Sequence, residues 1–204
     1  GGTADVSLGG FLPGWALHGV KWIAIFVIPL GILWFAEIRS SQGKLERLGA
    51  IVADLPTSAR AHVNYATELQ EAGRDDEAAK EFSEVIRLNP GSAKAHVNLG
   101  SLLTAKGELD AAESHFEQAL RIEPKNAEYH SGYAYLLDQL GRKDQAASEC
   151  ETAIRLAPKS AQAHYAYGAF LEKHGQPEEA IAKYRQTLQL DPAHLDAHID
   201  LGSL

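Results

Sequence analysis

Apolar and small residues between Ala59 and Asp191 recur in the same order every 34 residues, and prolines mark the interval. The prolines are Pro56, Pro90, Pro124, Pro158 and Pro192. A fixed period of this length is typical of stacked helix-turn-helix units, none of which can bury its apolar face alone. The pattern predicts complete units over residues 59–92, 93–126, 127–160 and 161–194, and the start of a fifth unit over 195–204.

Residues at fixed positions within each unit indicate two antiparallel helices joined by a tight turn. The eighth position is small, which lets the helices approach closely. Its residues are Ala66, Gly100, Ala134, Gly168 and Gly202. Each complete unit also has a glycine where its first helix should end, because a left-handed backbone closes the helix there. These glycines are Gly73, Gly107, Gly141 and Gly175.

The same positions resemble the tetratricopeptide repeat family, which also has a small residue at position 20 and a large apolar residue at position 24. Position 20 is alanine in all four units, and position 24 is Phe82, Phe116, Cys150 and Tyr184 in turn. Position 4, where the family often has tryptophan, is instead occupied by His62, His96, His130, His164 and His198. The resemblance implies an all-α fold, a right-handed helix-turn-helix solenoid.

An uncharged apolar stretch before the repeats predicts a membrane anchor. Extended over residues 16–38, it would span about 34 Å as a helix, against a hydrocarbon core of about 30 Å. Trp22 and Trp34 lie near its ends, as interfacial aromatic residues do, and Pro29 at mid-span is tolerated when neighbouring groups compensate. No cleavage site follows, and a core helix would not be apolar on every face. We therefore expect a single-pass transmembrane helix, preceded by an irregular arm over residues 1–15.

The segments next to the predicted span do not decide on which side of the membrane the repeats lie. Arg39, Lys44 and Arg47 follow the span and Lys21 alone stands near its N-terminal end, before the uncharged stretch, so the charge balance favours repeats on the cytoplasmic side. Bacterial anchored proteins of this resemblance often place their repeats in the periplasm. Residues 39–58 combine a polar hinge with apolar residues at helical spacing, and we expect them to form a half-repeat helix that caps the first unit.

Charge and cysteine content limit the possible functions further. The formal net charge of -8 belongs to the repeats, because residues 1–58 carry four basic and four acidic side chains. This balance argues against a nucleic-acid partner. The single cysteine, Cys150, occupies an apolar position, so we expect a buried, unreactive thiol.

No constellation of nucleophiles, metal ligands or phosphate-binding residues stands out, so we expect no enzymatic activity, no metal and no cofactor. The position-4 histidines occur once per unit, and packed helices stand about 10 Å apart. Two such histidines could not share a zinc ion, whose ligand bonds are about 2 Å. We expect these rings to pack between helices.

The resemblance implies a peptide-binding groove, because in this family the first helix of each repeat lines the concave surface. The groove-facing residues that we predict to bind are Arg60, Asn64, Thr67, Lys94, Asn98, Ser101, Tyr135 and Tyr165. Asn64 and Asn98 occupy equivalent positions, where an amide can donate to and accept from a peptide backbone. Relatives that hold a peptide carboxylate use basic residues where this chain has Glu128 and Gly132, which disfavours that mode of binding.

Two hypotheses for function follow. The first is a membrane-anchored scaffold that binds extended peptide segments or subunits of a membrane complex, as an assembly factor or accessory subunit. The second is a purely structural subunit, held in the lipid bilayer by its transmembrane helix and N-terminal arm, with the groove unused.

Overall fold

The computed structural model describes residues 42–204, where all regular structure is helical. The predicted arm and transmembrane helix, including Trp22, Pro29 and Trp34, lie outside the described residues. Within residues 42–204, no helix is both long enough and apolar enough to cross a bilayer. The chain divides after Ala50 into two compact parts, and the part that holds the repeats is described here by itself.

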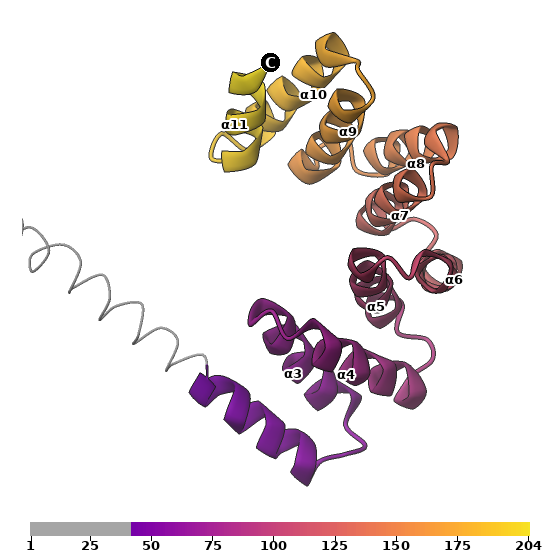
Figure 1. Cartoon of the computed structure of the whole chain (residues 1–204), viewed down its shortest axis with the longest axis vertical. Helices are drawn as coiled ribbons and strands as arrows, with labels where there is room; N and C mark the ends of the chain where they lie inside the picture. The colour runs from indigo at the N-terminus through magenta and orange to yellow at the C-terminus, as the bar shows by residue number, and fades with distance from the viewer. Residues whose placement is uncertain (1–41) are drawn as a thin grey trace, which may run out of the picture. The chain divides into compact units, whose positions relative to one another are not determined.

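A helix over residues 42–54 is followed by nine helices at regular intervals (Figure 1). Eight of the nine form pairs, each within one 34-residue unit, and the ninth begins the fifth unit. The pairs are α3 (Ala59–Glu71) with α4 (Asp75–Leu88), α5 (Ala93–Lys106) with α6 (Leu109–Ile122), α7 (Ala127–Gln139) with α8 (Lys143–Leu156), and α9 (Ala161–Lys173) with α10 (Pro177–Leu190); α11 (Leu195–Ser203) follows.

The turns and helix ends follow the local signals in the sequence. Gly73, Gly107, Gly141 and Gly175 all have φ between 71° and 80°, the left-handed conformation that glycine adopts at least cost. The side chains of Ser58 and Ser160 accept hydrogen bonds from backbone N–H groups of α3 and α9, which caps these helices. Acidic residues open α4, α6, α8 and α10, at the positive end of the helix dipole.

The first helices of the second, third and fourth repeats contact one another as well as their own partners. Helix α5 contacts α7, and α7 contacts α9, while each first helix packs most extensively on the second helix of its repeat. Figure 1 shows α5, α7 and α9 along the inner side of the arc of helices, with α6, α8 and α10 outside them. This arrangement places the predicted groove-facing helices side by side.

Small residues at position 8 permit close contact with the large side chain at position 24. Phe82, Phe116 and Tyr184 are almost completely buried. A Cβ atom added to Gly100 would lie 3.0 Å from the ring of Phe116, and one added to Gly168 would lie 2.6 Å from the ring of Tyr184. The helices are therefore as close as these glycines allow.

The position-4 histidines are buried or half-buried in the four complete units, whereas His198 of α11 is exposed, and all five form a repeated hydrogen bond that we call the histidine bridge. In each unit, Nε2 of the histidine donates to the carbonyl oxygen of the proline six residues earlier. The distances are 3.1 Å for His62 and Pro56, 3.2 Å for His96 and Pro90, 2.9 Å for His130 and Pro124, 3.0 Å for His164 and Pro158, and 2.9 Å for His198 and Pro192. The bridge fastens the loop that enters each repeat to that repeat's first helix.

Candidate functional site

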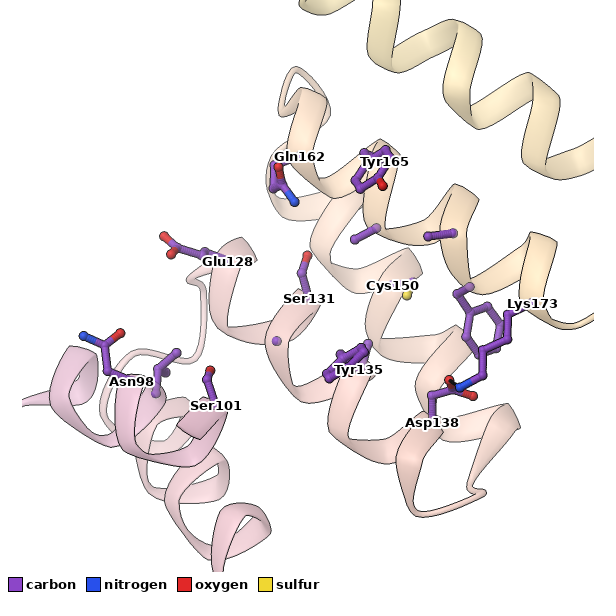
Figure 2. Close-up of a pocket in the computed structure, with 16 residues that line it drawn as sticks. Asn98, Ser101, Glu128, Ser131, Tyr135, Asp138, Cys150, Gln162, Tyr165 and Lys173 are labelled. Atoms are coloured by element: carbon purple, nitrogen blue, oxygen red, sulfur yellow. Dashed lines mark hydrogen bonds and ion pairs between the residues drawn. The ribbon is translucent and has the colours of Figure 1, made fainter. Parts of the chain in front are cut away.

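A groove of about 620 Å³ runs along α5, α7 and α9, the first helices of the second, third and fourth repeats (Figure 2). Its polar lining consists of Asn98, Ser101, Glu128, Ser131, Asp138, Gln162 and Lys173. Its remaining lining is small, aliphatic or aromatic, with one buried thiol: Val97, Gly132, Ala134, Tyr135, Cys150, Tyr165, Ala166, Ala169 and Phe170. The groove therefore offers hydrogen-bonding groups next to an apolar floor.

Four polar side chains of the groove are free to bond a ligand. Within residues 42–204, the side chains of Asn98, Ser101, Ser131 and Gln162 make no hydrogen bond. The two amides can each donate and accept, and so can the two hydroxyls. An extended peptide exposes one N–H and one C=O group at each residue apart from proline, and these side chains match both.

The two groove tyrosines differ in how freely they can contact a ligand. Tyr135 is 62% exposed and projects into the groove. The Tyr165 hydroxyl donates to Asp200 of α11 at 3.0 Å, and its ring lies 4.6 Å from that of His194. Burial and the carboxylate of Asp200 raise the pKa of Tyr165 to about 12, so its hydroxyl stays protonated at neutral pH. The ring of Tyr165 is thus held in place as part of the groove wall, whereas the ring of Tyr135 is accessible to a ligand.

Asp138 joins the third repeat to the fourth at the carboxyl ends of α7 and α9. It accepts hydrogen bonds from Lys173 Nζ at 2.5 Å and from His174 Nε2 at 2.6 Å. Burial alone would raise the pKa of Asp138, but the hydrogen bonds and charges of Lys173 and His174 outweigh burial and lower it. Because Lys173 is paired in this way, Glu128 is the groove carboxylate that has no ion pair within the described residues.

Cys150 lies at the bottom of the groove, behind α7 and α9 (Figure 2). Its side chain belongs to α8 and is buried, as the sequence predicted. Burial raises the pKa of the thiol to about 12, so Cys150 is a neutral thiol at physiological pH and a poor nucleophile. Its contribution to the groove is its shape rather than its reactivity.

The structure brings half of the predicted binding residues together. Asn98, Ser101, Tyr135 and Tyr165 line the groove. Four others, which do not line it, are exposed on α3 and on the first turn of α5: Arg60, Asn64, Thr67 and Lys94. The hydroxyl of Thr67 donates to the carbonyl oxygen of Val63 in its own helix. The groove lining comes from α5, α7, α8 and α9, so the first repeat contributes no side chain to it.

Several groove residues were not among those predicted to bind, and one pair of them has a detectable sequence signal. Asp138 and Lys173 are 35 residues apart, one repeat plus one position, which places opposite charges on neighbouring first helices. Gln162 and Phe170 occupy ordinary helix positions and give no such signal. Within residues 42–204, no group of three or more histidine, cysteine or acidic side chains is arranged to hold a metal ion.

Comparison with known proteins identifies the family. Three family profiles, each described as a tetratricopeptide repeat, match residues 63–127, 103–169 and 161–194. The chain is a tetratricopeptide repeat protein. No curated protein sequence matches it significantly.

Solved tetratricopeptide repeat structures share its fold. TTC0263 of Thermus thermophilus is 21% identical, with a TM-score of 0.73 over 86% of this chain and 95% of its own. MamA is 20% identical, with a TM-score of 0.62 over 74% of this chain and 89% of its own. YrrB, described as having an unusual peptide-binding site, is 22% identical, with a TM-score of 0.56 over 78% and 82%. These identities are low, so the likeness shows the fold alone.

The third tetratricopeptide repeat departs from the family pattern at a position that bears on the groove. Position 24 is aromatic in the other three complete repeats and is Cys150 in the third. The groove reaches this residue between α7 and α9. The departure from the family pattern therefore lies at the bottom of the groove.

Proposed function

We propose that this tetratricopeptide repeat protein is a membrane-anchored scaffold that holds an extended segment of a protein partner along α5, α7 and α9. The observation that carries the proposal is the set of unbonded polar side chains, Asn98, Ser101, Ser131 and Gln162, above an apolar floor. Such side chains bond a peptide backbone without selecting a sequence, while the exposed ring of Tyr135 adds contact area at low entropic cost.

Two further observations support this function. YrrB has the same fold and is described as having a peptide-binding site, so the architecture is compatible with a peptide ligand. The uncharged residues 22–36 of this chain, with tryptophans near both ends, support a place at the membrane. A scaffold anchored there would act as an assembly factor or accessory subunit of a membrane complex. We propose no enzymatic activity for it.

The experiment is to purify the full chain from native membranes, identify the protein that it retains, and measure retention by groove variants. Asn98→Ala removes neutral hydrogen bonds worth about 0.5–1.5 kcal/mol each, so retention should weaken roughly two- to tenfold. Adding Tyr135→Ala should weaken it further. Asn64→Ala is the matched control, because Asn64 occupies the equivalent position one repeat earlier and does not line the groove.

The same measurements decide between the two hypotheses for function. If the groove variants retain the partner as well as the wild type, while deletion of residues 1–20 abolishes retention, the groove is idle. The chain would then be a structural subunit held by its anchor and arm.

A further inference from the structure

The aromatic residue at position 24 normally fills the space between neighbouring first helices. Phe116 shows this in the second repeat. A Cβ atom added to Gly100 of α5 would lie 3.0 Å from its ring, and one added to Gly132 of α7 would lie 2.9 Å away. The ring therefore closes the gap between α5 and α7 from below.

The third repeat lacks this filling. The residues equivalent to Gly100 and Gly132 are Ala134 of α7 and Ala166 of α9, and Cys150 stands where Phe116 stands. All three line the groove. Alanine at position 8 does not forbid a ring, since Ala66 accompanies the buried Phe82 in the first repeat. The thiol is smaller than the phenyl ring at this position in the second repeat, and although it is only 3% exposed it lines the groove; we call the part of the groove next to Ala134, Cys150 and Ala166 the Cys150 pocket.

The walls of the Cys150 pocket suit an apolar side chain. Ala134, Cys150, Ala166 and Ala169 carry no charge, and the thiol is neutral at physiological pH. The ring of Phe170 also lines the groove there. A large apolar side chain placed among these groups would lose its contact with water without separating any hydrogen-bonded pair.

The charge at the groove's edge indicates what should stand near that apolar side chain. Of the three charged groove residues, Asp138 and Lys173 neutralise each other and Glu128 has no ion pair within residues 42–204. Glu128 precedes Ala134 by six residues on α7, a rise of roughly 9 Å at 1.5 Å per residue. An extended peptide covers that distance in about three residues.

We propose that the segment held in the groove seats one large apolar side chain, of leucine or phenylalanine size, in the Cys150 pocket and places a lysine or arginine about three residues away, beside Glu128. This inference rests on the proposed peptide-binding function and specifies its ligand. The unbonded amides and hydroxyls hold the backbone, and the pocket and Glu128 select the sequence.

Substitution of Cys150 tests the pocket directly. Cys150→Phe supplies the ring that the repeat pattern has at this position, so it should fill the pocket while preserving the packing of α7, α8 and α9. Cys150→Ala is the control that leaves the pocket open. Ala166→Leu fills the same space from α9, which keeps the test valid if Cys150→Phe does not fold.

The experiment uses the full chain in lipid nanodiscs and a displayed library of random 12-residue peptides, with empty nanodiscs for counter-selection. Enriched peptides should share one large apolar residue and a basic residue about three positions from it. A fluorescein-labelled peptide of that sequence should bind Cys150→Phe about ten- to a hundredfold more weakly than wild type, as expected for losing the burial of one such side chain. Cys150→Ala should bind it normally, and Glu128→Gln should bind it several-fold more weakly.

A double-substitution cycle completes the test. Changing the apolar residue of the peptide to alanine should weaken binding to the wild type but not weaken binding to Cys150→Phe further. Peptides that bind the groove without a shared apolar residue, and equally to Cys150→Phe, would overturn this inference and leave the proposed function standing. No enrichment over empty nanodiscs would overturn both. If the chain instead self-associates and Cys150→Phe abolishes association, the occupant is a second copy and the peptide proposal is wrong.

Discussion

Histidine at position 4 keeps one hydrogen bond constant in every repeat and leaves the other variable. Nε2 always donates to a proline carbonyl, so Nδ1 must find its partner at position 23 of the same repeat. That partner is a glutamate for His62 and His130, with Nδ1 to carboxylate distances of 2.6 and 2.5 Å. In the second repeat it is His115, 3.0 Å from Nδ1 of His96. In the fourth repeat, Nδ1 of His164 is buried without a partner.

The His96–His115 pair should make stability depend on pH. Burial, and then the neighbouring His96, lower the pKa of His115 below its usual 6.5. The unfolded chain then binds a proton more readily than the folded chain, so this contribution to stability is complete above about pH 6.5 and is lost as the pH falls.

The variant His115→Gln can still donate to His96 but does not titrate at this position. We therefore expect its unfolding midpoint to fall less than that of the wild type when the pH is lowered from 7.5 to 5. Thermal unfolding of both proteins at several pH values measures the difference. A difference in midpoint that does not vary with pH would contradict this explanation.

In the other complete repeats Nδ1 of the position-4 histidine bonds to position 23, and in the fourth repeat position 23 is Lys183. The ammonium of Lys183 lies instead 5.1 Å from the centre of the Tyr167 ring. Lys183→Gln would place an amide donor where Glu81 and Glu149 reach Nδ1 in other repeats. Relief of an unsatisfied buried acceptor is worth about 1–3 kcal/mol, against about 0.5–1 kcal/mol for an exposed cation–π contact. We therefore expect a higher midpoint in urea, and a lower one would show that the cation–π contact dominates.

Glycine at position 8 should be required only where the facing ring lies too close for a methyl group, as it does at Gly168. Gly168→Ala would bring a Cβ atom within 2.6 Å of Tyr184, whose hydroxyl is held by Glu172, and should cost about 1–3 kcal/mol by overpacking. Gly202 occupies the same position in α11 and has nothing within 4 Å of an added Cβ atom. Gly202→Ala should be neutral or slightly stabilising. Equal losses in urea unfolding for the two variants would contradict this account.

At the scale of helices, the repeat period and the glycines were enough to predict the helix pairs. Each turn glycine has a backbone that local chemistry dictates, and each small residue at position 8 marks a helix crossing. The groove was less predictable. Asn98 and Tyr135 were found from their positions in the repeat, but Asn64 has an equivalent position and lies outside the groove. The depth of the groove depends on Cys150, which belongs to the second helix of its repeat. Nothing in the sequence around Cys150 indicates that it contacts the groove.

The hydrogen bonds of Asp138 with Lys173 and His174 should fasten α7 to α9. Asp138→Asn weakens the hydrogen bond to the mostly buried His174, worth about 1.5–3 kcal/mol, and the half-exposed pair with Lys173, worth about 0.2–1 kcal/mol, so the fourth repeat should become measurably less stable. Hydrogen exchange of α9 and α10 amides measures this locally. Asp144→Asn, on the opening turn of α8, is the control because Asp144 has no ion pair within the described chain. Unchanged exchange in α9 would show that packing alone holds the two repeats together.

At the scale of the whole molecule, the membrane anchor stays a prediction because it lies outside residues 42–204. If residues 16–38 span the bilayer, the full chain should remain with the membrane during alkaline carbonate extraction. A chain that begins at Lys44 should be released and remain helical by circular dichroism. Appearance of the full chain in the carbonate supernatant would show that the anchor hypothesis is wrong.

The histidine bridge also determines where this protein could be lengthened or shortened. Each bridge joins a histidine to the proline six residues before it, and the position-23 partner follows 19 residues later, at His115 for His96. A segment that starts at one proline and stops just before the next, such as residues 90–123, contains its own bridge complete. Duplication or excision at the prolines would therefore copy or remove intact modules. A boundary placed after Pro90 and before His96 would separate the histidine from its own proline, so each inserted copy would take its acceptor from the proline of the segment before it.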